Sequence, residues 1–77
     1  MEIRLFTAPA CTWCKKLKEY LKKKKISYQE FDIGEIDTAR DELLEKTGQL
    51  AVPTIDINGT YIVGFDEPAL EKALSKV

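Results

Sequence analysis

The chain has 77 residues, of which 44% are hydrophobic and 32% are charged, so we expect one compact domain, residues 1–77, and no second one. Twelve basic and 13 acidic residues give a net charge of −1, which argues against a nucleic-acid partner because no field of one sign would attract it. Histidine is absent, and its absence excludes histidine-dependent nucleophilic catalysis and removes the commonest metal ligand.

No targeting or membrane signal is recognisable in the sequence. The first six residues, MEIRLF, lack the basic and apolar regions of a secretory signal, and no apolar run approaches the roughly 20 residues of a membrane span. We therefore expect a cytoplasmic protein that has no membrane partner.

The first half of the chain predicts a strand, a helix and a second strand. Residues 3–6 form an apolar run before Pro9, which is typical of a buried central strand. Residues 12–25 predict an amphipathic helix, with seven lysines between apolar side chains at helical spacing: Trp13, Leu17, Tyr20 and Leu21. Residues 28–33 alternate and predict a strand that turns Phe31 and Ile33 inward and an acidic side outward.

The second half predicts a helix and a hairpin. Asp37 or Thr38 would cap the helix and Gly48 would end it, with an apolar stripe formed by Ile36, Ala39, Leu43 and Leu44. Residues 53–57 and 61–63 are β-branched runs joined by Asn58-Gly59, a dipeptide suited to the positive φ angles of a tight hairpin.

The end of the chain predicts a third helix. Asp66 or Glu67 can cap it, and Pro68 lies in its first turn. Its buried stripe would contain Ala69, Leu70, Ala73, Leu74 and Val77. The element order is therefore βαβαββα, an α/β arrangement with a parallel βαβ unit and an antiparallel hairpin.

Charge is divided unevenly along the chain. Seven of the 12 basic residues lie on the first predicted helix, and seven of the 13 acidic residues lie between Glu30 and Glu45. The lysines form either a solvated helix face or a surface that orients an acidic partner protein.

Cys11 and Cys14 are the only cysteines, and they lie where the first strand passes into the first helix. A loop this short stabilises a fold little, so reactivity explains the pair better. Unpaired amides and the helix dipole would lower the pKa of Cys11 from about 8.5 to within roughly 3.5–7.5, and Lys15 would add positive charge. We therefore predict that Cys11 is the nucleophile and that Cys14, one turn further, is the resolving thiol.

A cysteine pair at this spacing can also bind zinc or simply fill a core. A zinc site needs four ligands, and the sequence has neither histidine nor a second cysteine pair, so we expect no metal site within the chain. Two unreactive core cysteines stay an alternative, and the protein would then be a non-catalytic adaptor.

Three segments resemble the glutaredoxin family: residues 5–16 (LFTAPACTWCKK), residues 51–54 (AVPT) and residues 63–66 (VGFD). The resemblance covers essentially the whole chain. It implies the minimal, glutaredoxin-like thioredoxin fold, with a four-stranded mixed sheet in the order 2-1-3-4 and three helices, the first and third on one face and the second on the other.

The resemblance also implies where a substrate binds. Val52-Pro53 would carry a cis peptide bond opposite the cysteines, and the backbone of Val52 would then pair with an extended substrate. Gly64, Phe65 and Asp66 would line the same site. Trp13 either covers the disulfide as an apolar contact or packs over the start of the helix.

The expected function is that of a dithiol-disulfide oxidoreductase, an enzyme that reduces protein disulfides and acts as a monomer without a bound cofactor. Glutathione or a flavin reductase of the thioredoxin-reductase type would regenerate the dithiol. Ala8 stands where glutathione-using members carry a lysine or arginine, and Val63 replaces the first glycine of a Gly-Gly pair, so the flavin reductase is favoured. The alternative is a [2Fe–2S] scaffold bridged through Cys11 with glutathione.

Overall fold

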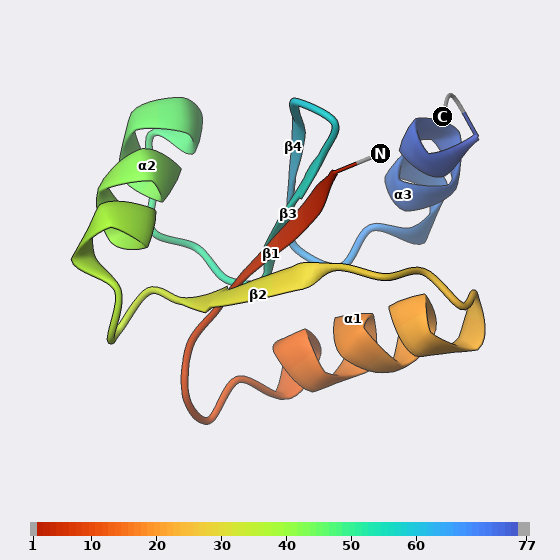
Figure 1. Cartoon of the computed structure of the whole chain (residues 1–77), viewed down its shortest axis with the longest axis horizontal. Helices are drawn as coiled ribbons and strands as arrows, with labels where there is room; N and C mark the ends of the chain where they lie inside the picture. Colours follow the sequence, from red (N-terminus) through yellow and green to blue (C-terminus); the bar gives the residue numbers. More distant parts are fainter. Residues whose placement is uncertain (1, 76–77) are drawn as a thin grey trace.

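The computed structural model describes residues 2–75, which form four strands and three helices in the predicted order βαβαββα. Figure 1 shows these elements in chain order: β1 (Ile3–Thr7), α1 (Thr12–Lys23), β2 (Gln29–Asp32), α2 (Asp37–Thr47), β3 (Thr54–Ile57), β4 (Thr60–Val63) and α3 (Glu67–Leu74).

The strands form one mixed sheet in the order β2-β1-β3-β4. β1 pairs in parallel with β2 and antiparallel with β3, and β3 and β4 form the antiparallel hairpin. Leu5 in β1 lies between Glu30 of β2 and Ile55 of β3. The expected central position of the first strand and the expected strand order are both confirmed.

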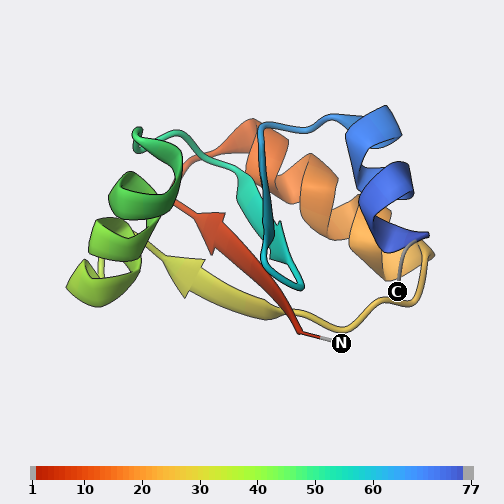
Figure 2. The ribbon, with the colours of Figure 1, turned by 90° about the horizontal axis from the view of Figure 1, so that it is seen from above.

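Helices cover both faces of the sheet. Leu17 and Leu21 of α1 and Leu70 of α3 belong to one buried cluster, whereas Ala39 and Leu43 of α2 belong to a second cluster. Figure 2 shows α2 on one side of the strands and α1 and α3 on the other. The predicted distribution of the helices is therefore confirmed.

The turns also follow the sequence closely. Asn58 and Gly59 have φ angles of 53° and 97°, as the tight hairpin requires. Gly48 ends α2 in the left-handed conformation, and its amide donates a hydrogen bond to the carbonyl of Leu44. α1 stops at Lys23, slightly earlier than expected, because Lys25 takes a positive φ of 57° and turns the chain toward β2.

The N-cap predicted for α2 is wrong. The cap is Ile36, which has no side-chain acceptor, and Asp37 is the first helical residue. The amide of Ile36 bonds the carbonyl of Asp32, so the turn after β2 closes one residue earlier than expected.

The stripe predicted for α2 is only partly buried. Ala39 and Leu43 are in the core, whereas Ile36 is 38% and Leu44 is 49% exposed, because the helix packs on the sheet along a narrow face. In α3 only Leu70 is fully buried, and Ala69, Ala73 and Leu74 pack at the margin of the core. The predicted burial of Val77 lies outside the described residues.

A cluster of hydrogen-bonded polar side chains links α2 to the sheet. Arg4 of β1 donates to Glu42 of α2, with Nη1 and Oε1 at 3.0 Å, and to Asp56 of β3, with Nε and Oδ2 at 2.9 Å. The hydroxyl of Tyr61 in β4 donates to Glu42 Oε2 at 2.6 Å. The pKa of Glu42 is lowered, mainly by its hydrogen bonds from Arg4 and next by the hydrogen bond from Tyr61. The pKa of Tyr61 is raised to about 12, mainly by burial and next by its hydrogen bond to Glu42.

Candidate active site

Cys11 and Cys14 lie at the junction between β1 and α1 and form a disulfide, with their Cα atoms 5.2 Å apart. Ala10 has a positive φ of 59°, which reverses the chain after β1 and places Cys11 at the N-cap of α1. The amide of Cys14 donates a hydrogen bond to the Sγ of Cys11 at 3.1 Å. Cys11 therefore occupies the helix N-terminus, as the sequence predicts.

The two sulfur atoms have different surroundings. Cys11 is partly exposed, whereas Cys14 is only 2% exposed. The first turn of α1 contains no acidic residue, so the partial positive charge of the helix end near Cys11 is not opposed within that turn. After reduction, the same amide and the helix end would stabilise a thiolate on Cys11 and leave Cys14 shielded from solvent.

An apolar groove of about 250 Å³ lies next to the active-site turn, because Trp13, which stands between the two cysteines in the sequence, is part of its lining. It is lined by five of the residues that the resemblance assigns to substrate binding: Trp13, Val52, Pro53, Gly64 and Phe65. The Val52-Pro53 peptide bond is cis, and the amide of Gly64 bonds the carbonyl of Pro53 at 2.7 Å. This bond joins the loop before β3 to the end of β4, so both segments form one wall.

Aromatic contacts shape the other wall of the groove. The Trp13 ring lies 6.2 Å from that of Phe65, and Phe65 makes an edge-on contact with Tyr20 at 5.7 Å. Lys16 places its Nζ 4.8 Å from the centre of the Trp13 ring. Trp13 is still 56% exposed, so it packs against its neighbours on one side and offers a free apolar surface on the other.

Asp66 and Lys15 lie outside this groove. Asp66 caps α3, and its Oδ1 accepts a hydrogen bond from the amide of Ala69 at 3.3 Å. Lys15 is exposed and borders a different hollow, of about 260 Å³, that both cysteines also line. The substrate role predicted for Asp66 and the pKa-tuning role predicted for Lys15 stay predictions.

This second hollow brings together charged residues that the sequence did not single out as a site. Lys18 of α1 and Glu30 of β2 form an ion pair there, with Nζ and Oε2 at 2.6 Å. Thr7 of β1 donates its hydroxyl to the same carboxylate oxygen at 3.1 Å. The alternation in residues 28–33 indicated an acidic outer side, but it could not show that Glu30 meets a lysine of α1.

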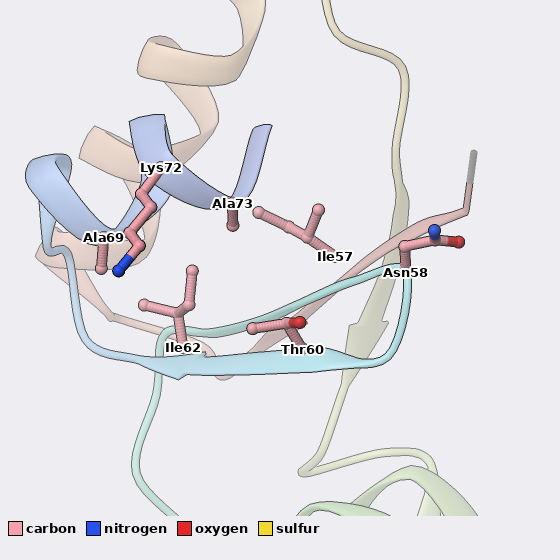
Figure 3. A pocket seen from close by; sticks show the side chains of 7 residues that line it. All are labelled: Ile57, Asn58, Thr60, Ile62, Ala69, Lys72 and Ala73. Atoms are coloured by element: carbon pink, nitrogen blue, oxygen red, sulfur yellow. The ribbon is translucent and has the colours of Figure 1, made fainter. Parts of the chain in front are cut away.

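A third hollow, of about 360 Å³, lies between the hairpin and α3. Figure 3 shows its lining, in which isoleucines and alanines are joined by three polar residues: Ile57, Asn58, Thr60, Ile62, Ala69, Lys72 and Ala73. Neither cysteine lines it, so it is separate from the candidate active site.

Residues 2–75 contain neither a cluster of metal ligands nor a membrane-spanning helix. No three side chains of the metal-ligating types cluster in this part of the chain. None of its helices has the length and apolar character needed to cross a membrane.

Comparison with known proteins identifies the family. The glutaredoxin family model matches residues 3–62. The chain belongs to the glutaredoxin family. A glutaredoxin-like 8.6 kDa protein from the rubredoxin operon of Clostridium pasteurianum, which is uncharacterized, is 38% identical over 74 residues, or 96% of this chain and 99% of the relative.

Solved structures support the same family and fold. The thioredoxin-like protein BC3987 has a TM-score of 0.87 at 33% identity, over 94% of this chain and 99% of its own. A buckwheat glutaredoxin in complex with glutathione has a TM-score of 0.77 at 26% identity, over 96% of this chain and 73% of its own. The family and the thioredoxin fold that the sequence predicts are both confirmed, and membership of the glutaredoxins supports thiol-disulfide oxidoreductase activity.

Proposed function

We propose that this glutaredoxin-family protein reduces disulfides of other proteins by a dithiol mechanism. The Cys11 thiolate attacks a substrate disulfide and forms a mixed disulfide, with one substrate thiol released. Cys14 then attacks Cys11, which releases the second substrate thiol and leaves the Cys11–Cys14 disulfide. The dithiol supplies two electrons and two protons to the substrate.

The observation that carries this proposal is the difference between the two sulfur atoms. Cys11 is partly exposed and accepts a hydrogen bond from the amide of Cys14, whereas Cys14 is buried one helical turn away. A substrate disulfide can approach Cys11 from solvent. Cys14 can reach only a sulfur that is already attached to Cys11, so the order of the two attacks follows from access.

The groove beside the disulfide favours a protein substrate. The five residues that line it carry no charge, and Trp13 and Phe65 give it an apolar wall. Such a groove suits an extended protein segment with an apolar residue near its cysteine better than it suits glutathione, a tripeptide that carries two carboxylates. The buckwheat relative is seen with glutathione, so glutathione is the alternative to be tested directly.

The oxidised protein needs an electron donor. We favour a flavin reductase of the thioredoxin-reductase type over glutathione, because Ala8 stands where glutathione-using members carry a lysine or arginine and the residues that line the apolar groove are uncharged. A cycle of this kind belongs to a compartment in which thiols are kept reduced, such as the cytoplasm.

The proposal is tested by supplying NADPH with either thioredoxin reductase or glutathione plus glutathione reductase, and by following NADPH consumption with a protein disulfide as substrate. We expect sustained turnover with thioredoxin reductase and slower turnover with glutathione. Cys11→Ser should abolish both. If neither donor sustained turnover, the proposal would be contradicted. Faster turnover with glutathione than with thioredoxin reductase would reverse the choice of donor.

The [2Fe–2S] scaffold stays a prediction. The described part of the chain offers Cys11 as an accessible thiol ligand, and further ligands would have to come from glutathione and a second chain.

A further inference from the structure

The resolving step requires that the buried Cys14 lose its proton. Its thiol is 2% exposed, and burial in apolar surroundings opposes ionisation of a cysteine. The apolar groove offers no charge to offset this effect, because its lining residues are uncharged. The charged side chains near Cys14 lie instead around the 260 Å³ hollow, which Cys14 itself lines.

Four charged side chains line this hollow together with the two cysteines. Lys15 and Lys18 come from α1, and Glu30 and Asp32 come from β2. β1 contributes the neutral side chain of Thr7.

Lys18 is the cation that the helix geometry directs toward Cys14. It follows Cys14 by four residues, so the two side chains lie on the same face of α1, with Cβ atoms roughly 5–6 Å apart. Lys15 also lines the hollow, but it is exposed, so solvent screens its charge more strongly than the charge of Lys18. The side chain of Lys18 is 35% exposed, so its charge is only partly screened by solvent.

The position of Lys18 is fixed by the sheet. Glu30 Oε2 accepts from Lys18 Nζ at 2.6 Å and from the Thr7 hydroxyl at 3.1 Å. Thr7 is 3% exposed and belongs to the central strand, so the carboxylate that holds Lys18 is itself anchored to the core. A lysine normally has considerable rotamer freedom, and this contact restricts it beside the cysteines.

We propose that Lys18, held by Glu30 and Thr7, is a positioning residue that supports ionisation of Cys14 for the resolving step. The inference rests on the proposed function, in which Cys11 attacks first. In the mixed disulfide, the Cys14 thiol releases its proton to solvent in the hollow, and the Lys18 ammonium stabilises the resulting thiolate. Cys14 Sγ bonds Cys11 Sγ, the bond from Cys11 to the substrate sulfur breaks, and the leaving thiolate takes up a proton.

The test separates the two attacks on one reagent, 5,5′-dithiobis(2-nitrobenzoate). One equivalent is mixed with the reduced protein, and the coloured thiolate is followed by stopped flow. The first release reports attack by Cys11 and depends on reagent concentration. The second release reports attack by Cys14 and does not. A Cys14→Ser variant should lose only the second release, which verifies the order of attack on which the proposed function rests.

Lys18→Met leaves Glu30 in the hollow without its ion-pair partner. We expect its second release at neutral pH to be about tenfold slower, the midpoint of its pH profile to rise by about one unit, and the first release to stay within about twofold. Lys18→Arg should restore most of the rate because it keeps the charge. Lys22→Met, one turn further along α1 and outside the hollow, is the matched control and should behave as the wild type.

The outcomes distinguish this inference from the proposed function. A second release of Lys18→Met within twofold of the wild type would overturn the role of Lys18 and leave the dithiol mechanism intact. A slower second release with an unshifted pH profile, or an equal loss in both releases, would also overturn it, because a packing defect would then suffice. Loss of the first release in Cys14→Ser would instead contradict the order of attack itself.

Discussion

The amide of Cys14 donates a hydrogen bond to the Sγ of Cys11 at 3.1 Å, so the resolving residue helps to prepare the nucleophile. The contact exists because Cys11 is the N-cap of α1 and Cys14 is the third helical residue, the usual geometry by which a cap side chain satisfies a free amide. In most helices a hydroxyl or carboxylate takes this position. Here a sulfur does so, and the helix end that it caps favours its negative charge.

Replacing Cys14 with serine should trap the first intermediate. The Cys11 thiolate would still attack a substrate disulfide, but no second thiol would be present to release the product. Mass spectrometry of Cys14→Ser with a protein disulfide should show a stable mixed disulfide at Cys11. Cys11→Ser is the control and should form little or none, because Cys14 is buried.

Truncating the apolar wall should weaken substrate binding more than it weakens the fold. Trp13→Ala removes an exposed ring beside the disulfide, so KM for a protein disulfide should rise about fivefold with a small change in kcat. The free energy of unfolding should change by less than about 1 kcal/mol. Steady-state kinetics and urea denaturation measure the two effects.

Leu44→Ala is the matched control for Trp13→Ala. Leu44 is 49% exposed on α2, which covers the other face of the sheet and contributes no side chain to the groove. Its KM should equal that of the wild type. An equal rise in KM for both variants, or no rise for Trp13→Ala, would contradict the assignment of the groove to substrate binding.

The cluster around Arg4 should give stability a specific pH dependence. The pKa of Glu42 is below its ordinary value of 4.5 in the folded protein, chiefly through its hydrogen bonds to Arg4. The ionised carboxylate therefore stabilises the fold fully above about pH 4.5, and this contribution is lost as the pH falls through the folded pKa. Glu42→Gln should lower the free energy of unfolding at neutral pH by about 1–2 kcal/mol, with the difference vanishing in acid.

Tyr61→Phe is the control for this effect. It removes the hydroxyl that bonds Glu42 but keeps the carboxylate and Arg4, so it should cost about 1 kcal/mol and keep most of the acid dependence. Urea denaturation across a series of pH values measures both variants. If the loss in free energy of unfolding caused by Glu42→Gln stayed the same in acid, the ion pair with Arg4 would not be the cause of that loss.

Tyr20 gives a prediction of the opposite sign. Its hydroxyl is buried and has no hydrogen-bond partner among the described residues, whereas its ring contacts Phe65 and Lys24. Tyr20→Phe keeps the ring contacts and removes the hydroxyl, so thermal unfolding should show unchanged or slightly greater stability. A loss of more than about 1 kcal/mol would show that the hydroxyl makes a stabilising contact.

The sequence predicts best those features that depend on residues close together in the chain. Spacing alone placed Cys11 at a helix start and Cys14 one turn on, and the dipeptide Asn58-Gly59 located the hairpin. The residues of the apolar groove were accessible only through the family resemblance, because Val52 and Phe65 are distant in sequence from Trp13 and nothing local links them.

Contacts set by strand register were not predictable. The alternation of side chains in residues 28–33 predicts that Glu30 lies on an acidic outer side of its strand. Its ion pair with Lys18 of α1 depends on the parallel pairing of β2 with β1, which the local sequence does not reveal. Arg4 and Asp56 meet for the same reason, because they are paired across antiparallel strands. The N-cap predicted for α2 is wrong because the turn after Asp32 places Ile36 at the cap: the amides of Glu35 and Ile36 bond the Asp32 carbonyl, and the amide of Gly34 bonds the Asp32 carboxylate.

The assignment of Cys11 as the nucleophile is tested most directly by the order in which the two reduced cysteines react with iodoacetamide near about pH 6, followed site by site with mass spectrometry. We expect Cys11 to be alkylated at least tenfold faster than Cys14, because Cys11 is accessible and its thiolate is stabilised at the helix N-terminus. Faster labelling of Cys14, or equal rates at the two sites, would contradict the assignment.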